Sequence, residues 1–256
     1  MKLAKNPFTK AIRQGEKQIG LWVALTSNYS AELIADAGYD WVIVDMEHSP
    51  NNMLSVLGQL QAFEKSPTTA LVRINWNDEI EVKRVLDMGA SGLMFPMIQT
   101  VEEAEKAVAS TRYPPHGVRG VAGATRATKF GRITDYFERV EEETTIIVQL
   151  ETQAAMERAE EIAAVDGISG VFFGPADISA DMGLLGQTMA PEVWEKIWAT
   201  TNKMIAMDMP VGTLVLDPKF ATKLLNDGFT FVACGIDSSL LAKAADDLLA
   251  EVKNGI

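Results

Sequence analysis

Short runs of apolar and β-branched residues alternate with longer amphipathic segments along the whole chain. The apolar runs are continuous, as expected for strands that are buried on both faces of a parallel sheet. They predict eight strands: Ile19–Leu25, Trp41–Met46, Ala70–Ile74, Gly92–Met97, Thr145–Glu151, Gly170–Gly174, Val211–Leu216 and Phe231–Gly235. The remaining segments predict eight helices: Ser30–Ala37, Asn52–Glu64, Asp78–Met88, Val101–Thr111, Thr152–Ala164, Pro191–Met207, Pro218–Asn226 and Ser238–Lys253.

Eight strands in strict alternation with eight helices predict an α/β fold, a single (β/α)8 TIM barrel that spans residues 1–256. The alternative is a doubly wound open sheet, which usually has fewer strands. A dinucleotide-binding sheet would also carry G-x-G-x-x-G after its first strand. The nearest run, Gly117-x-x-Gly120-x-x-Gly123, has a different spacing and follows no strand.

One segment departs from this alternation. Tyr113–Val140 contains a Pro-Pro-His-Gly sequence and then Arg126, Lys129 and Arg132, without clear periodicity. Long ordered insertions in compact domains are often functional lids or binding loops. The alternative interpretation is a solvated basic loop.

The composition limits the class of protein. Hydrophobic residues make up 47% of the chain, which is ample for a buried core and excludes disorder. The 23 basic and 35 acidic residues give a formal charge of −12, which argues against nucleic acid or an anionic membrane as a partner. No uncharged run is long enough to span a membrane. The single Cys234 cannot form an internal disulfide, so we expect a cytoplasmic protein.

Polar side chains interrupt the apolar runs at the carboxyl ends of several predicted strands, where this fold builds its active site. Asp45 and His48 lie at the end of the second strand, and Arg73 lies at the end of the third. Glu151 ends the fifth strand and Asp177 follows the sixth. Such groups are costly to bury unless they are paired. We therefore expect them to converge at one mouth of the barrel.

Glu151 and Asp177 follow neighbouring predicted strands, so their carboxylates are expected to lie close together. Two unpaired carboxylates would repel each other, and a divalent cation removes that conflict. With only two histidines in the chain, a His-rich zinc site is excluded. Oxygen ligands favour a hard ion, Mg²⁺ or Mn²⁺, with Co²⁺ as a further candidate. The alternative is that each carboxylate is paired with an arginine or a helix N-terminus.

His48 and Arg73 are the other candidates for chemistry. His48 lies among acidic residues at a strand end and is a candidate general base, the alternative being a structural histidine. Arg73 is suited to a bidentate contact with a substrate carboxylate or a developing enolate oxygen, the alternative being that it only neutralises the carboxylate pair. No lysine ends a predicted strand, which argues against a Schiff-base mechanism.

Taken in order, these motifs resemble the HpcH/HpaI aldolases, a family of metal-dependent class II pyruvate aldolases, over nearly the whole chain. Each motif alone is weak, and six in the same order are a strong signal. They are Tyr39–Pro50 (YDWVIVDMEHSP), Val72-Arg73, Leu86–Ala90 (LDMGA), Tyr113–Gly120 (YPPHGVRG), Gln149–Thr152 (QLET) and Gly170–Ser179 (GVFFGPADIS). Met46 and the sequence Thr128-Lys129-Phe130 depart from the family's common Gly and Ser-Arg-Trp, which puts the specificity for the aldehyde in doubt.

The resemblance implies reversible cleavage of a 4-hydroxy-2-oxo acid into pyruvate, or a related 2-oxo acid, and an aldehyde, through a metal-stabilised enolate. It implies that Glu151 and Asp177 bind the metal, that His48 is the base and that Arg73 stabilises the enolate. The substrate-binding residues would be Asp45, Arg73, Gln149 and the backbone N–H groups of Ala176 and Asp177. The resemblance also implies a homo-oligomer, a hexamer, in which the apolar terminal helix Ser238–Ala250 packs on a neighbouring subunit.

Asp87 corresponds by resemblance to the acid that raises the basicity of the histidine. It lies near the end of the predicted helix Asp78–Met88, and helices in this fold run away from the catalytic mouth. The stretch from Asp78 to Asp87 spans about 15 Å at roughly 1.5 Å per residue. We therefore expect Asp87 either to act on the histidine of a neighbouring subunit or to be an ordinary residue at a helix end.

Two alternatives to an aldolase are compatible with the sequence. One is another metal–enolate lyase, such as a decarboxylase or an acyl-CoA-using enzyme, although a CoA substrate would need a basic groove that only the Arg119–Arg132 region offers. The other is a non-catalytic barrel that acts as a binding or assembly subunit. That subunit would show no metal dependence and release no pyruvate.

Overall fold

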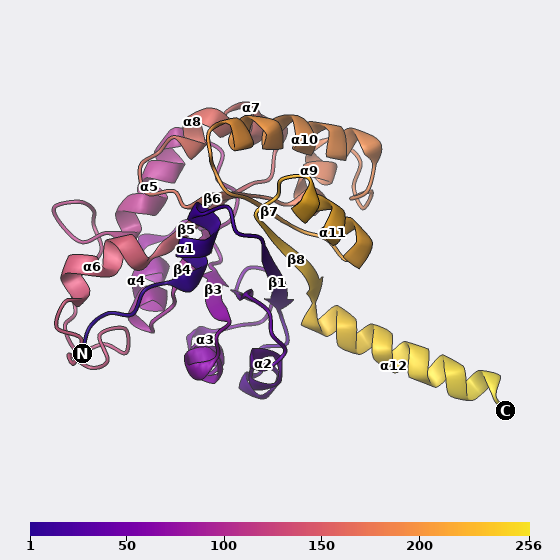
Figure 1. Cartoon of the computed structure of the whole chain (residues 1–256), viewed down its shortest axis with the longest axis horizontal. Helices are drawn as coiled ribbons and strands as arrows, with labels where there is room; N and C mark the ends of the chain where they lie inside the picture. Colours follow the sequence, from indigo (N-terminus) through magenta and orange to yellow (C-terminus); the bar gives the residue numbers. More distant parts are fainter.

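The computed structural model describes residues 1–256 and shows a closed barrel of eight parallel strands (Figure 1). Each strand pairs with the next along the chain, and pairing between the last and the first closes the barrel. The strands are β1 (Gln18–Val23), β2 (Trp41–Asp45), β3 (Thr69–Arg73), β4 (Gly92–Phe95), β5 (Thr145–Leu150), β6 (Gly170–Phe173), β7 (Val211–Leu214) and β8 (Phe231–Ile236). The predicted (β/α)8 barrel is thus confirmed.

Most of the helices pack around the outside of this barrel (Figure 1). They are α1 (Pro7–Arg13), α2 (Asn28–Ala35), α3 (Met53–Ala62), the 3-10 turn η1 (Phe63–Lys65), α4 (Glu79–Asp87), α5 (Val101–Thr111), α6 (Tyr136–Glu143), α7 (Gln153–Glu157), α8 (Ala159–Ala163), α9 (Pro175–Asp181), α10 (Pro191–Ala206), α11 (Pro218–Asn226) and α12 (Asp237–Asn254). Three of them, α1, α6 and α9, were not expected from the sequence. The predicted helix Thr152–Ala164 is two helices, because Arg158 leaves the helical region with φ −98° and ψ 10°.

Helix α1 closes the N-terminal end of the barrel. Its Phe8 is 1% exposed and lies with ring centroids 5.5 Å from Trp41 and 5.7 Å from Phe231. Asn6 caps the helix and also donates from Nδ2 to the carbonyl oxygen of Ser91 at 2.8 Å. Gly20 is required here because a Cβ at that position would come within 2.2 Å of the Trp41 ring. With this end filled, the cavity of the barrel opens at the carboxyl ends of the strands.

Two apolar layers hold the barrel together. Alternate side chains of each strand point inward, where Ile43, Leu71 and Ile147 are completely buried with the aromatic cluster around Phe8. The other side chains point outward and form a larger core with the surrounding helices. Runs that are apolar at every position therefore reflect strands buried on both faces, as the sequence predicted.

Helix α12 extends away from the barrel (Figure 1). Beyond Ser238, every residue is exposed. Five large apolar side chains of the helix are more than half exposed: Leu240, Leu241, Leu248, Leu249 and Val252. Only the beginning of the helix is fixed, because Asp237 is buried and accepts backbone hydrogen bonds from Ala24 at 2.8 Å and Leu25 at 3.2 Å. No helix of the structure combines the length and hydrophobicity that a membrane span requires.

Candidate active site

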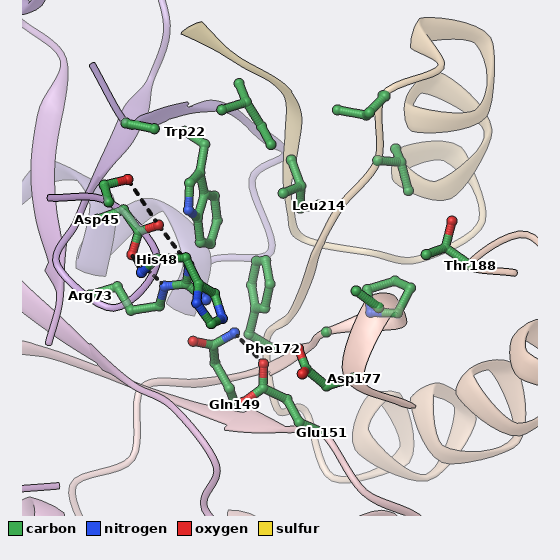
Figure 2. A pocket seen from close by; sticks show the side chains of 18 of the residues that line it. Trp22, Asp45, His48, Arg73, Gln149, Glu151, Phe172, Asp177, Thr188 and Leu214 are labelled. Carbon is green, nitrogen blue, oxygen red and sulfur yellow. Dashed lines mark hydrogen bonds and ion pairs between the residues drawn. The ribbon is translucent and has the colours of Figure 1, made fainter. Parts of the chain in front are cut away.

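A cavity of about 670 Å³ opens at the carboxyl ends of the strands (Figure 2). All but one of the site residues predicted from the sequence line it: Asp45, His48, Arg73, Gln149, Glu151, Ala176 and Asp177. The exception is Asp87. Because the lining residues come from the ends of several strands, the closure of the barrel brings together positions that are far apart in the sequence.

Arg73 and Asp45 form a buried ion pair. Their Cα atoms are register partners in β2 and β3. Arg73 donates from Nε to Asp45 Oδ1 at 2.8 Å and from Nη2 to Oδ2 at 2.7 Å. Burial tends to raise the pKa of Asp45, but the hydrogen bonds and charge of Arg73 outweigh it and hold that pKa below its usual value. Asp45 is therefore a charged group that fixes the guanidinium in one orientation.

The other contacts of Arg73 come from Glu47 and Trp22. Nη1 of Arg73 lies 2.7 Å from Glu47 Oε2, and the guanidinium carbon lies 5.0 Å from the centroid of the Trp22 ring. Arg73 thus pairs directly with Asp45 and Glu47 rather than with Glu151 and Asp177. Neither Glu47 nor Trp22 was predicted as a site residue, although Trp22 occupies an inward-facing position near the end of the first strand.

Glu151 is a buried carboxyl group whose hydrogen bonds come from uncharged donors. It is 2% exposed, and it accepts from the backbone N–H of Met97 at 2.8 Å and from Gln149 Nε2 at 3.0 Å. Burial raises the pKa of Glu151 to about 8, and the nearby charge of Asp177 adds to the effect, while the Met97 hydrogen bond opposes it. The expected alternative, pairing with an arginine or a helix N-terminus, does not apply to Glu151.

The backbone next to Glu151 leaves room for its carboxylate. Gly174 directly follows β6, and a Cβ at this position would lie 2.5 Å from Glu151 Oε1. Any other residue at position 174 would have to displace the carboxylate. Gly174 is a site residue that the sequence analysis missed, and its signal is the absence of a side chain between a buried strand and Pro175.

The donor set fits a divalent cation. Glu151 and Asp177 supply carboxylate oxygens to the same cavity, and Figure 2 shows the two side chains beside each other. The buried Oε1 of Gln149 has no hydrogen-bond partner. No group of three or more His, Cys, Asp and Glu side chains could hold a metal ion by itself. Two carboxylates suit a hard cation that keeps positions open for other oxygen ligands.

His48 lies at the accessible side of the cavity. Its side chain is 66% exposed, and Nε2 lies 3.8 Å from Glu47 Oε2. Burial raises the pKa of Glu47, while the charges of Arg73 and His48 oppose that rise. An imidazole in contact with solvent and next to the cavity can accept and release a proton. The other histidine, His116, contacts Glu141 at 3.1 Å and does not line the cavity.

Ala176 and Asp177 belong to the first turn of α9, a helix that begins at Pro175 directly after β6. The first N–H groups of a helix have no acceptor within the helix. Both residues line the cavity, so this turn can present backbone donors there. The strand end was predicted from the sequence, whereas the helix that organises these two residues was not.

Asp87 lies outside the cavity, at the last residue of α4. Its Oδ1 accepts a hydrogen bond from Nη2 of Arg119 at 2.6 Å. The Arg119 side chain is completely buried and stacks over the Tyr113 ring at 4.6 Å. These contacts anchor the Tyr113–Val140 insertion on α4. Within one chain, Asp87 therefore contacts the insertion and none of the cavity residues.

The fold is a (β/α)8 barrel whose cavity, at the carboxyl ends of the strands, gathers carboxylates, an arginine and a histidine. The sequence model of the HpcH/HpaI aldolase/citrate lyase family matches residues 18–244. The chain is 46% identical to the 4-hydroxy-2-oxo-heptane-1,7-dioate aldolase of Salmonella dublin, over 96% of this chain and 94% of that one. It is 44% identical to the protein of the same name from Shigella flexneri, over 98% and 94%.

A solved structure agrees with this assignment. The HpcH/HpaI aldolase/citrate lyase family protein from Burkholderia cenocepacia J2315 superimposes with a TM-score of 0.94 at 36% identity, covering 97% of this chain and 100% of that one. The chain therefore belongs to the HpcH/HpaI aldolase family, whose members are carbon–carbon lyases. The resemblance seen in the sequence is confirmed.

Proposed function

We propose that this protein is a divalent-metal-dependent aldolase that cleaves a 4-hydroxy-2-oxo acid into pyruvate, or a related 2-oxo acid, and an aldehyde. The observation that carries the proposal is the cavity that joins two carboxylates, a fixed guanidinium and an accessible imidazole. The names of the relatives from Salmonella dublin and Shigella flexneri support this class of substrate.

Glu151 and Asp177 are the residues proposed to hold the cation, Mg²⁺ or Mn²⁺, with Co²⁺ as a further candidate. When bound, such a cation supplies Lewis-acid stabilisation of the negative charge that develops on the 2-oxo oxygen during cleavage. Arg73 supports the same charge from the protein side, because Asp45 and Glu47 hold its guanidinium in place beside Trp22. The group is preorganised, which is how electrostatic stabilisation becomes effective in a buried site.

The remaining residues bind substrate and move a proton. The N–H groups of Ala176 and Asp177 would receive the substrate carboxylate, and Gln149 would contact the substrate through its unpaired Oε1. His48 would take the proton from the 4-hydroxyl group. The bond between C3 and C4 then breaks, the aldehyde leaves, and C3 gains a proton to give the methyl group of pyruvate. In synthesis the same steps run in reverse.

A coupled assay tests the proposed function. The protein, given a racemic 4-hydroxy-2-oxo acid and Mn²⁺ or Mg²⁺, is expected to release pyruvate, measured as NADH oxidation by lactate dehydrogenase. Treatment with EDTA should abolish the release because the carboxylate pair then lacks its cation, and added Mn²⁺ should restore it. Pyruvate release that continues unchanged in EDTA would contradict metal dependence. A complete lack of pyruvate release under all conditions would favour the non-catalytic alternative.

A CoA substrate fits the cavity poorly. Arg73 is its only Lys or Arg, and this side chain is already paired with Asp45 and Glu47. The phosphates of CoA would have no cations to bind in this part of the chain. This observation favours a small 2-oxo acid over an acyl-CoA.

Asp87 is proposed to be a positioning residue for the histidine of a neighbouring subunit. Its carboxylate is 21% exposed, and the insertion next to it exposes Val118 and Val121 by 59% and 66%. A surface of this kind is suited to contact with a second copy of the chain. The hydrogen bond from Arg119 would keep Asp87 oriented at that contact.

Hybrid oligomers test this role of Asp87. Asp87→Asn and His48→Asn should each lower kcat about a hundredfold or more while the chain stays folded. Chains of the two variants, unfolded and refolded together, should regain part of the wild-type rate, because some sites then combine an intact His48 with an intact Asp87. Refolding each variant alone is the control. If the mixture is no more active than its components, Asp87 does not act across subunits.

The exposed apolar side chains of α12 are the basis for a proposal about the oligomeric state. All four leucines of α12 are more than half exposed, and this apolar surface is large for a helix that stays in water. We propose that α12 packs on another copy in a homo-oligomer, a hexamer by resemblance to the family. The cytoplasm is the proposed location, because the single Cys234 is a free thiol.

A further inference from the structure

His48 lies on the short loop that joins β2 to α3, and its side chain has few contacts of its own. The side chain is 66% exposed, and its Nε2 lies 3.8 Å from Glu47 Oε2 without a hydrogen bond. Figure 2 shows His48 on the same side of the cavity as Asp45 and Arg73. The place of the imidazole beside the cavity therefore depends on the backbone of the loop.

Two sets of hydrogen bonds hold this loop, one at each end. At the start, Asp45 Oδ1 accepts from the backbone N–H groups of Glu47 at 3.0 Å and His48 at 3.4 Å. At the end, Asn51 Nδ2 donates back to the carbonyl oxygen of Asp45 at 2.6 Å. Asp45 and Asn51 thus tie the two ends of the loop together, which fixes the backbone of His48 between them.

Asn51 is in turn held by α3. Its Oδ1 accepts from Gln59 Nε2 and from Ser55 Oγ, both at 2.7 Å. Gln59 is completely buried, so its side chain is packed in one orientation. Hydrogen bonds from Gln59 through Asn51 to Asp45 therefore connect the interior of the molecule to the loop that carries the candidate base.

Gln59 has a further feature that points to this role. Its buried Oε1 has no hydrogen-bond partner, which lowers the stability of the fold. A leucine at this position would avoid that loss, and would give up only the hydrogen bonds of Nε2 to Asn51 and to the carbonyl oxygen of Ser55. An apolar residue would thus serve stability at least as well, and what the amide adds is its contact with Asn51.

We propose that Asn51, held by Gln59, is a positioning residue for His48, because it keeps the loop where the imidazole can reach the 4-hydroxyl group of the substrate. The inference rests on the proposed function, in which His48 takes the proton of that group. The hydrogen bonds that link Gln59, Asn51 and Asp45 all lie within one chain. The inference is therefore independent of what a neighbouring copy contributes to the site.

Asn51→Asp removes the donor and little else. The new carboxylate can still accept from Gln59 and Ser55, but it turns an oxygen toward the carbonyl oxygen of Asp45, which should push the loop away. We expect kcat for cleavage of a 4-hydroxy-2-oxo acid to fall about 30-fold or more, since a misplacement of about 1 Å can cost about a hundredfold. Asn52→Asp is the matched control and should keep the wild-type rate, because Asn52 caps α3 and aspartate is an equally good cap.

Oxaloacetate separates a displaced base from a damaged cavity. Breaking its C3–C4 bond releases CO₂ and leaves the electron pair in the enolate of pyruvate, which takes a proton from water, so no hydroxyl group has to lose one. With Mn²⁺, and after subtraction of the rate without protein, Asn51→Asp should turn over oxaloacetate within about threefold of the wild type. Calorimetric titration should show normal Mn²⁺ binding. Equal losses in both reactions, or cleavage at the wild-type rate, would overturn the inference.

Gln59→Leu tests the contact that holds Asn51. Its kcat for cleavage should fall about tenfold, while the midpoint of thermal unfolding stays equal or rises, because the unpaired Oε1 is gone. Gln61→Leu, at an exposed position of the same helix, is the control and should keep the wild-type rate. The double variant Asn51→Asp, Gln59→Leu should be within about twofold of Asn51→Asp, since both changes act through one contact. Losses that multiply would contradict this link.

The wild-type protein distinguishes the failure of this inference from the failure of the proposed function. Turnover of both substrates by the wild type, together with unimpaired cleavage by Asn51→Asp, would overturn only the role of Asn51. If the wild type turns over neither the 4-hydroxy-2-oxo acid nor oxaloacetate, the proposed function is wrong, and this inference with it.

Discussion

Glu151→Gln is expected to lower pyruvate release at least about a thousandfold and to abolish binding of the divalent cation. Removing several kcal/mol of charge stabilisation at the 2-oxo oxygen accounts for a loss of this size, since about 4 kcal/mol corresponds to a factor of about a thousand. Excess Mn²⁺, which rescues the EDTA-treated wild type, should not rescue this variant. The lactate dehydrogenase assay measures the rate, and calorimetric titration with Mn²⁺ measures binding.

The Glu151→Gln chain should fold, because the new amide can be accommodated. Met97 can still donate to the side-chain oxygen, and Gln149 can turn its unpaired Oε1 toward the new NH₂ group. Glu157→Gln is the matched control, since the Glu157 side chain is 72% exposed and pairs only with Lys196 at 3.5 Å. Thermal unfolding should be similar for both variants. Normal Mn²⁺ binding by Glu151→Gln would contradict the assignment of Glu151 as a ligand.

Arg73→Lys is expected to lower kcat by roughly 10² to 10³, with a smaller effect on KM. Lysine keeps the positive charge but cannot reproduce the two parallel hydrogen bonds to Asp45 together with the contact to Glu47. Its ammonium group is therefore not held where the enolate charge develops. Steady-state kinetics in the pyruvate assay at saturating Mn²⁺ measure both constants.

The control for Arg73 lies on the surface of the barrel. Arg112 also pairs with an aspartate, Asp166, at 2.9 Å, but Asp166 is 92% exposed and neither residue lines the cavity. Arg112→Lys should leave kcat within about twofold, because an exposed ion pair contributes little. An equal effect of the two substitutions on kcat would indicate that Arg73 acts only through the stability of the fold.

The sequence predicted the barrel well because its signal is local. A strand buried on both faces is apolar at most of its positions, and each of the eight runs shows that pattern, with polar residues such as Asp45, Arg73 and Gln149 toward the carboxyl ends. Helix α1 was not predicted, because its place in the core depends on contacts between residues far apart in the sequence. Pro7–Arg13 carries Lys10 and Arg13 and looks like a surface segment, and only the contacts of Phe8 with Trp41 and Phe231 make it part of the core.

The sequence predicted where the candidate site residues lie better than it predicted which residues they pair with. Strand ends identified Asp45, Arg73 and Glu151, because parallel strands place their carboxyl ends at one edge. The sequence did not reveal that Arg73 pairs with Asp45 and Glu47, since that choice depends on the register of β2 and β3. The roles of Gly174 and Trp22 likewise depend on distances of a few ångströms between strands that lie far apart in the sequence.

The buried Asp237 has a consequence for how the protein is studied. It ties the start of α12 to the loop after β1, and its two neighbours, Ile236 and Ser238, line the cavity. The helix that is proposed to pack on another copy of the chain thus begins in the wall of the candidate active site. In an assembly held by α12, the residues at the start of this helix would take part both in quaternary structure and in substrate binding. We then expect the rate to depend on the chain concentration, and we expect a tag fused after Ile256 to change the rate by disturbing the contacts of α12.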